Sequence, residues 1–421
     1  MKTWLTYLAA VAMGLAFQLT FRDSSTFVSV MGFMSNLVLK LGIFTVFPLA
    51  FFTMSSGTAS LSRRRGRTGF VWISTIFWAI LTSLVLSVIA TLVFWIFPSA
   101  FPVTSTTPQS VQQSTAIYNS LTNSTITKLV MANPLSLNAF LNFIKSSDCL
   151  IPVVFIALVF GYAVRPTSEI VRPAYITINS ISEIMFRLAR QIAKYLSIGL
   201  FFIAGAWFND MWIDGTVLYS WRFVTLCCIA ALLILLVAIP LIYAIVTGFR
   251  RNPYRQISRL ISAAVASFFS DNYLFSQCTL YTDCRINLGI QKSVVSTSLP
   301  LHSILTKGGS SLVSTICTCS LIYTITGSIP SFIQMVTIAF ACTLISFISC
   351  LHAGYEVVFI ASYALGILDL NIAGAEFSLL GMIPLLNGIA LMLDVVLAGL
   401  GTSFTAYHLK ADCHIVRRDT V

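Results

Sequence analysis

The chain has 421 residues, of which 57% are hydrophobic and only 9% are charged. Because a soluble domain carries about 25% charged residues, this composition excludes an ordinary soluble protein. The net charge of +11 would suggest nucleic-acid binding on a soluble protein. Here the basic residues lie in short stretches between apolar runs, so we interpret them as signals of membrane topology and expect no nucleic-acid partner. The runs are continuous and long enough to cross a bilayer, which predicts an all-α membrane protein rather than a barrel.

Ten cysteines are spread along the chain, mostly inside apolar stretches, and no Cys or His cluster has the spacing of a zinc site. A free cysteine in such a stretch behaves as a small buried hydrophobe. No Ser/His/Asp, HExxH or paired-aspartate pattern indicates an enzyme. We therefore expect no metal site, no catalytic residues and no chemical cofactor.

Six apolar runs in the first 250 residues predict membrane-spanning helices. The first run resembles a signal peptide but lacks a small-x-small cleavage site, so we interpret it as an uncleaved span. Residues 103–127 are rich in Ser, Thr, Gln and Asn without apolar periodicity, which predicts a loop. The expected spans are residues 4–20, 27–57, 69–98, 128–164, 176–206 and 222–248.

Basic residues gather in every second loop of this arrangement. Segments 61–68, 165–194 and 249–259 carry four, five and four of them, whereas segments 22–26, 99–131 and 207–221 carry two in total. Because cytoplasmic loops carry the excess of Lys and Arg, the N-terminus is predicted to be cytoplasmic. The C-terminal tail is expected on the same side if an even number of crossings separates the two.

The last 160 residues differ from the rest because each apolar piece is interrupted by polar or glycine-rich residues. Segments 257–290, 300–325 and 332–370 are interrupted at Ser267–Asn272, Thr306–Ser310 and Ser349–Glu356. Unwound backbone within a membrane is tolerated only where it is buried in protein or lines a cavity. Paired interrupted segments indicate a transporter's binding site near the midplane. The chain is therefore predicted to combine a plain helical half with a functional half.

Short motifs follow one another in a fixed order along nearly the whole chain. They are Val38–Phe52 with Ser56–Leu61, Gly66-Arg67-x-Gly69, Asn133-Pro134, Pro152–Gly161, Arg251-Asn252-Pro253, Asn287–Ile290 and Pro300-Leu301. In this order they resemble the dicarboxylate/amino acid:cation symporters, the family of glutamate and aspartate transporters.

The resemblance implies eight transmembrane helices and two re-entrant helical hairpins, at about 257–290 and 332–370, in a homotrimer of elevator-type transporters. It also implies an integral, multi-pass protein in the bilayer of a bacterial inner membrane. The expected division of the chain is 1–68, scaffold helices one and two; 69–98, transport-domain helix three; 99–221, polar loop and scaffold helices four and five; 222–409, transport core; and 410–421, cytoplasmic tail.

The sequence departs from the family pattern at the site itself. At the break after Pro300-Leu301, Thr306, Lys307 and Gly308 replace the family's Asn, Met and sodium-binding Asp. In the last span, Asn387 stands where the family holds the substrate ammonium with Asp. Ala390 stands where the family clamps the side-chain carboxylate with Arg. An acidic amino acid would therefore lose both charge partners, and a neutral amino acid or another polar solute fits better.

Three further replacements in the last span affect cation binding. By the same alignment Leu391 replaces a substrate-contacting Thr, Asp394 replaces a substrate-binding Asn, and Ala398 replaces a sodium-binding Asp. Because the sodium carboxylates are lost, the family's sodium sites are expected to be weakened or abolished, which leaves Na+ or H+ as the candidate coupling ion. A buried ammonium is costly in a membrane and needs a partner. We therefore predict that a Lys307–Asp394 pair substitutes for bound sodium, with coupling to protons or none; the alternative is that Lys307 reaches water or a carbonyl.

Two more carboxylates lie near the predicted hairpin tips. Asp271 and Glu356 are either proton carriers or caps at a water-filled vestibule. The candidate substrate-binding residues are Ser270, Asp271, Asn272, Ser310, Ala353, Gly354, Asn387 and Asp394. The candidate cation-coupling residues are Thr306, Lys307, Gly308, Ser349, Glu356 and Asp394.

These observations favour a symporter, a secondary active transporter of a small polar solute such as an amino acid or a carboxylate. The alternative is a transporter-derived channel or a solute sensor without coupled transport. Loss of the sodium carboxylates favours the alternative, and the glycine-rich hairpin tips argue against it.

Overall fold

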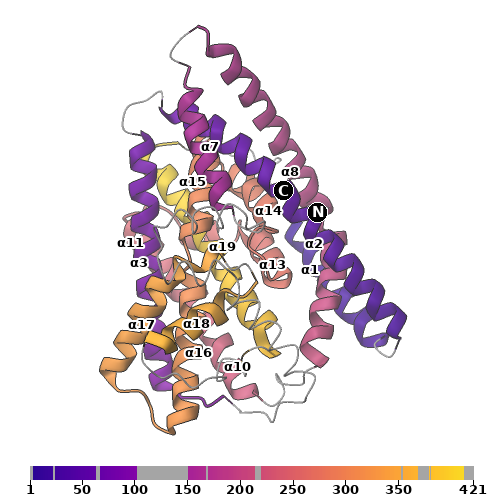
Figure 1. The fold of residues 1–421 in the computed structure, drawn as a ribbon, viewed down its shortest axis with the longest axis vertical. Helices are drawn as coiled ribbons and strands as arrows, with labels where there is room; N and C mark the ends of the chain where they lie inside the picture. Colours follow the sequence, from indigo (N-terminus) through magenta and orange to yellow (C-terminus); the bar gives the residue numbers. More distant parts are fainter. Residues whose placement is uncertain are drawn as a thin grey trace.

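A computed structural model describes residues 3–21, 24–62, 67–101, 150–166, 169–213, 220–351, 354–367, 379 and 381–411. Within these ranges all regular structure is helical, and seven helical segments are long and apolar enough to cross a membrane (Figure 1). The prediction of an all-α membrane protein is confirmed. The predicted loop at 103–127 and most of the span at 128–164 lie outside the described residues.

Four helices near the start of the described chain pack against one another and form what we call the first helix group (Figure 1). They are α1 (Thr3–Thr20), α2 (Ser25–Ser62), α7 (Ile151–Ala163) and α8 (Arg172–Ile213). Only about a third of the residues in the membrane-spanning windows of α1, α2 and α8 are buried, at 33%, 28% and 39%. The first group therefore presents most of its apolar surface outward.

The remaining helices form the second helix group, built around α3 (Arg67–Ile96) and the C-terminal half. One of its spans runs through α10 (Trp221–Leu233), a π-helical turn η1 (Ile234–Ala238) and α11 (Ile239–Val246), followed by the short α12 (Pro253–Ile257). Pro240 has no N–H, so it cannot bond to the carbonyl of Leu236 one turn earlier. The hydroxyl of Tyr254 donates to that carbonyl at 2.9 Å instead, which explains how the irregular turn is tolerated.

Two pairs of short helices turn back on themselves within the second group. The arms of the first pair are α13 (Ile261–Ser270) and α14 (Gln277–Thr282), and α14 continues into the π turn η2 (Asp283–Asn287). The arms of the second pair are α17 (Phe332–Ser346) and α18 (Glu356–Ile367), with the 3₁₀ turn η3 (Ser349–Leu351) between them. At 1.5 Å per residue, helices of 10 to 15 residues reach about 15 to 22 Å, less than the 30 Å hydrocarbon layer. Both predicted re-entrant hairpins are thus present, close to the expected positions.

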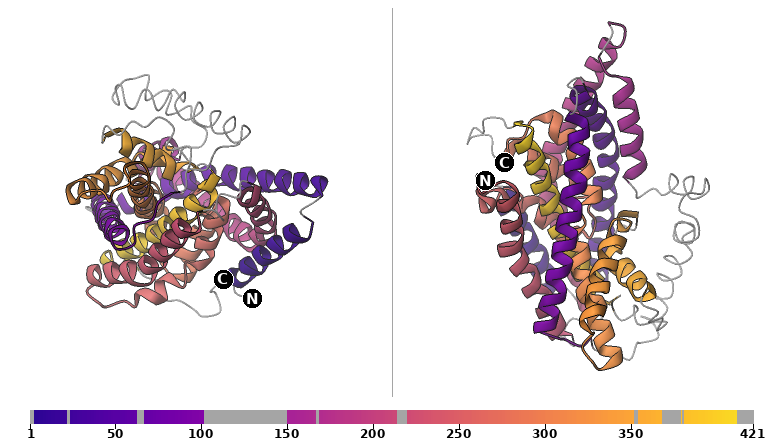
Figure 2. Two further views of the ribbon diagram at one scale, coloured as in Figure 1. Left: turned by 90° about the horizontal axis from the view of Figure 1, so that it is seen from below. Right: turned by 90° about the vertical axis from the view of Figure 1, so that its left-hand side faces the viewer.

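Three helices pack against α3 and against one another at the centre of the second group (Figure 2). They are α15 (Lys292–Leu305), α16 (Gly308–Thr326) and α19 (Ile383–His408). The spanning windows are 83% buried for α15–α16 and 89% buried for α19. Thr306 and Lys307 separate α15 from α16, at the interruption predicted from the sequence.

Three hydroxyl side chains of α16 bond to carbonyls of their own helix one turn earlier. Ser314 donates to the Ser310 carbonyl at 2.7 Å, Thr315 to the Ser311 carbonyl at 2.7 Å, and Thr318 to the Ser314 carbonyl at 2.8 Å. All three side chains are fully buried. The helix therefore satisfies its polar groups without water, as a buried hydroxyl requires.

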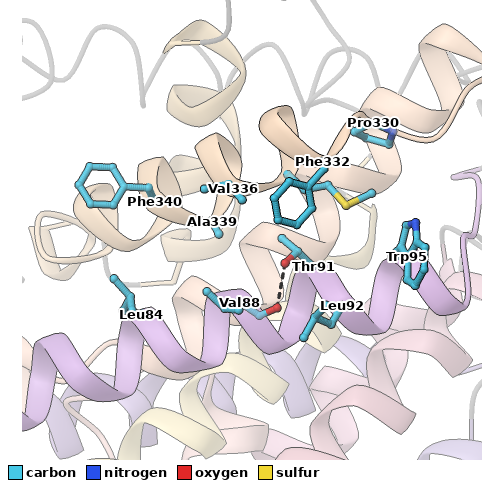
Figure 3. A pocket seen from close by; sticks show the side chains of 11 residues that line it. Leu84, Val88, Thr91, Leu92, Trp95, Pro330, Phe332, Val336, Ala339 and Phe340 are labelled. Atoms are coloured by element: carbon cyan, nitrogen blue, oxygen red, sulfur yellow. Dashed lines mark hydrogen bonds between the residues drawn. The ribbon is translucent and has the colours of Figure 1, made fainter.

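An apolar groove of about 490 Å³ separates α3 from α17 on the outside of the second group (Figure 3). Its walls include Val88, Leu92 and Trp95 from α3 and Phe332 and Phe340 from α17 (Figure 3). The hydroxyl of Thr91 is turned back to the Val88 carbonyl at 2.8 Å, so it leaves no free polar group there. This lining suits hydrocarbon and offers no polar recognition.

Candidate functional site

The break between α15 and α16 exposes the first backbone N–H groups of α16, and a carboxylate of α19 occupies that position. Asp394 Oδ1 accepts from Gly309 N at 2.6 Å and from Ser310 N at 3.3 Å, and Oδ2 accepts from Ser310 Oγ at 2.5 Å. A carboxylate is favoured there because it meets unsatisfied donors and the positive end of the helix dipole. Asp394 thus caps α16 from a neighbouring helix.

Glycine at position 309 makes this close approach feasible. A Cβ atom at Gly309 would lie 2.3 Å from the Ala390 carbonyl and 3.1 Å from the Asp394 nitrogen. Since both contacts are with backbone atoms, any larger residue would push α19 away from α16. The glycine-rich break therefore holds the capping carboxylate in place.

Lys307, the residue before α16, forms a fully buried ion pair with Glu356 at the start of α18. The Lys307 Nζ to Glu356 Oε1 distance is 2.9 Å, and both side chains have no exposed surface. The prediction that Lys307 pairs with Asp394 is therefore wrong, because the partner of Lys307 is Glu356. Asp394 faces the N–H groups of α16, whereas Lys307 precedes them and reaches the second hairpin. Asp394 still acts on Lys307 electrostatically.

An aromatic ring completes the surroundings of the lysine. Lys307 Nζ lies 4.3 Å from the centroid of the Tyr273 ring, a distance at which a cation is attracted to the face of the ring. Tyr273, which directly follows the Ser270–Asn272 tip, is not among the site residues predicted from the sequence. The ammonium is thus held by the second hairpin on one side and by the first hairpin on the other.

The tip of the first hairpin consists of the three predicted residues Ser270, Asp271 and Asn272. Asp271 ends α13 with φ of 50°, in the left-handed region that Asp adopts more readily than most residues. The Asn272 side-chain oxygen accepts from Leu274 N at 2.9 Å, and Ser270 Oγ donates to the Asn272 carbonyl at 3.2 Å. These local bonds fix the turn and leave the Asp271 carboxyl group as the charged group of this tip.

The tip of the second hairpin lies against the first and is tied to α19. Asn387 donates to the Gly354 carbonyl and accepts from Val357 N at 3.1 Å. A Cβ atom at Gly354 would lie 3.7 Å from the Asp271 carbonyl, so the two tips are in contact range. Ser349, in contrast, bonds back to the Ser346 carbonyl at 2.7 Å. Ala353 lies outside the described residues.

Thr306 belongs to a separate hydroxyl cluster around a buried histidine. His302 Nδ1 pairs with Thr306 Oγ1 at 3.3 Å, and Nε2 pairs with Thr405 Oγ1 at 3.2 Å and Thr75 Oγ1 at 3.4 Å. The cluster links α15, α19 and α3, and His302 is fully buried. Its role is to join three core helices. Gly308 likewise packs against apolar atoms, because a Cβ there would meet Leu397 at 2.8 Å.

The boundary between the two helix groups is polar. Glu183 of α8 pairs with Arg285 of η2 at 3.0 Å and with Lys292 of α15 at 3.2 Å. Nearby, a Cβ atom at Gly57 of α2 would lie 2.6 Å from Thr297 Oγ1 and 2.8 Å from Ser296 Cβ. The two groups thus meet through half-exposed ion pairs and a close helix contact.

Comparison with known protein families gives one finding for this arrangement. The model described as the Sodium:dicarboxylate symporter family matches residues 3–398, which is nearly the whole chain. The match includes both hairpins, the α15–α16 break and α19 up to Ala398.

Proposed function

Because the chain belongs to the sodium:dicarboxylate symporter family, we propose that it is a secondary active transporter of a small polar solute, of the amino-acid or carboxylate type. The observation that carries this proposal is the meeting of a broken helix and two hairpin tips around a buried ion pair. Broken helices whose ends face one another are the usual binding site of secondary transporters. The site residues are those placed above at the α15–α16 break, the tips and α19.

The two helix groups correspond to the proposed scaffold and transport domain of an elevator. The second group has its own buried centre and contains the whole candidate site, so it can move as one body carrying the solute. The first group is apolar on its outside, which suits a membrane-anchored scaffold in a homotrimer. We further propose that the N- and C-termini lie in the cytoplasm of a bacterial cell, with the protein in its inner membrane, because the basic residues gather in every second loop.

The residues of the break do not fit a sodium ion. Gly308 and Ala398 supply no carboxylate, and the buried ammonium of Lys307 adds a fixed positive charge to the same region. We propose that Lys307, held by Glu356, takes the place of the family's bound sodium. Transport is then independent of sodium and driven by protons. Glu356 is the proposed proton carrier because its Oε2 is buried without a hydrogen-bond partner.

The test is uptake by the purified, reconstituted full-length protein. Vesicles are given a sodium gradient, a proton gradient or neither, and accumulation of radiolabelled amino acids and carboxylates is measured. We expect accumulation with the proton gradient alone. The Glu356→Gln variant should lose accumulation but still exchange solute, while the exposed Glu169→Gln variant serves as the matched control.

Three results would contradict the proposal. Accumulation driven only by sodium would show that the family's usual coupling survives. Flux that never exceeds equilibrium under any gradient would indicate a channel. A Lys307→Met variant that folds and keeps the same uptake and ion dependence would remove Lys307 from the mechanism.

A further inference from the structure

On the premise of the proposed transport function, one carboxyl group at the hairpin tips has no ion-pair partner among the described residues. Lys307 and Glu356 neutralise each other at 2.9 Å. Asp394 is held by two backbone N–H groups and one hydroxyl at the start of α16. Asp271 is the remaining carboxylate of this cluster, and among the described residues no lysine or arginine is paired with it.

The hydrogen bonds of Asp271 are also incomplete. Its Oδ1 is buried and has no hydrogen-bond partner, and its carboxyl group otherwise interacts with the amide of Asn387. Glu356 Oε2 is a second buried oxygen without a partner, and the two carboxylates are close enough to repel each other. Buried acceptors of this kind are costly unless a donor reaches them. The site therefore lacks a positively charged hydrogen-bond donor.

A cavity of about 250 Å³ leads to Asp271 between the two helix groups. It is bounded by α1, α2 and α8 on one side and by the end of α13 and the start of α19 on the other. Its described lining contains two carboxylates and no lysine or arginine: the polar residues are Gln18, Ser35, Asn36, Asn209, Asp210, Ser270 and Asp271. The buried Gln18 Oε1 is a further acceptor without a partner, so the walls favour cations.

Opposite Asp271, the site offers nothing for a second carboxylate of a solute. Ala390 is fully buried where an arginine would be required for a bidentate clamp. Asn387, in the position of the family's ammonium-binding acid, has its amide engaged by the second hairpin. Asp271 approaches the same amide from the first hairpin, so the negative charge missing from α19 is restored by a different element.

We propose that the transported solute carries an ammonium or guanidinium group bound by Asp271, which makes it a cationic amino acid or a related amine rather than a dicarboxylate. The solute enters through the cavity beside Asp210 and reaches the Asp271 carboxyl group. Its cationic group supplies the donor that Asp271 Oδ1 lacks. Lys307 stays bound to Glu356 and takes no part in recognition.

The experiment measures ligand-induced thermal stabilisation of the purified full-length protein, since a ligand of the folded state raises the melting temperature. The probes are L-lysine, L-arginine, agmatine, L-alanine, L-aspartate and succinate, each in potassium and in sodium buffer of equal ionic strength. We expect L-lysine or L-arginine to stabilise the protein in both buffers. The Asp271→Asn variant should bind the same probe about tenfold or more weakly, because a charge-assisted hydrogen bond is lost. Glu169→Gln, with the same change in net charge, should bind normally.

The outcomes distinguish this inference from the proposed function. Stabilisation by aspartate or succinate, with Asp271→Asn unchanged, would overturn the cationic solute but leave a transporter. Stabilisation by sodium alone, or by none of the cationic probes, would also overturn it. Failure of the proposed function would instead appear as cation binding without accumulation in vesicles. If Asp271→Asn does not fold, Asp210→Asn provides the second test, and it should weaken binding of the same cation.

Discussion

The first and second helix groups both contain long apolar helices, yet they differ in how much of each helix is buried. Among the spanning windows, α2 of the first group is 28% buried and α19 of the second is 89% buried. Large apolar side chains such as Phe33 and Phe44 point outward from α2. The charges and hydroxyls of α15, α16 and α19 are enclosed. The difference shows that the most buried helices of this protein are those that contribute to the candidate site.

The second group can enclose the charged side chains around the α15–α16 break because each of them is paired within the protein. Lys307, Glu356 and Asp394 each have partners from another element. In hydrocarbon an unpaired charge is costly, so each of these elements must stay in register with the others. The described residues of the first group contain no fully buried ion pair, so we expect this group to tolerate more substitutions. The experiments below test this difference, from the largest expected effect to the smallest.

Replacing Lys307 with Met should produce the largest loss of stability. It leaves the buried Glu356 carboxylate without its partner, which costs about 3–5 kcal/mol in the free energy of unfolding. The Lys307→Met/Glu356→Gln double variant should recover most of this loss, because no isolated charge remains. Denaturant unfolding in detergent measures both. Equal losses in the single and double variants would mean that packing, not charge, makes Lys307 important.

Two glycines of α2 should respond to alanine with opposite signs. At Gly57 a Cβ would collide with Thr297 and Ser296 of α15, which predicts a loss of about 1–3 kcal/mol and slower uptake. At Gly32 a Cβ would meet nothing within 4 Å, so Gly32→Ala should stabilise the helix by up to about 1 kcal/mol. Thermal unfolding checks both. If both variants lost stability equally, the contact between the groups at Gly57 would not limit packing.

The ion pairs across the boundary should matter less for stability than for movement. Glu183→Gln removes the pairs with Arg285 and Lys292, which are partly exposed and screened, so the expected loss is below about 1 kcal/mol. If the groups slide past each other, the variant should change the rate of uptake at low salt and match the parent at high salt. An unchanged rate at low salt would show that this contact does not break during transport.

The last comparison places one substitution in each group, and the smallest effect is expected in the first group. Ile176→Val on the exposed side of α8 should change the unfolding free energy by less than about 0.5 kcal/mol. Ile316→Val in the fully buried α16 should cost about 0.5–1.5 kcal/mol. Denaturant unfolding of the pair gives the difference. A larger effect at Ile176 would indicate that α8 is covered in the assembled protein.

Much of the fold could be predicted from the sequence because apolar length and interruption act locally. The span expected at 69–98 is α3, and the polar residues at 267–272 and 349–356 lie at the turns of the two hairpins. The break at 306–307 was predicted for the same reason. Among the described helices, α8 differs from the expected span at 176–206 because it continues to Ile213. Its polar residues Asn209 and Asp210 line a cavity, so they can remain on the helix.

The partners within the site could not be predicted, because they depend on which carboxylate faces which end of a helix. Glu356 and Asp394 were both candidates near Lys307, and the sequence gives no distance between them. The choice follows from where α16 begins, since its free N–H groups take Asp394 and leave Glu356 to the lysine. The Tyr273 ring was missed because an aromatic residue in an apolar chain has no local sign of binding a cation.

The hydroxyl side chains of α16 have a consequence for how the second group could travel through a bilayer. The bonds from Ser314, Thr315 and Thr318 to the carbonyls one turn earlier begin and end on α16, and a further bond from Ser314 reaches the Val357 carbonyl of α18 within the same group. A rigid displacement of several ångströms would neither stretch nor exchange any of them. Sliding would then alter only the outer contacts with lipid and with the first group, while the polar interior keeps a constant internal energy. The energetic barrier to such a movement would then arise only at the surface of the second group.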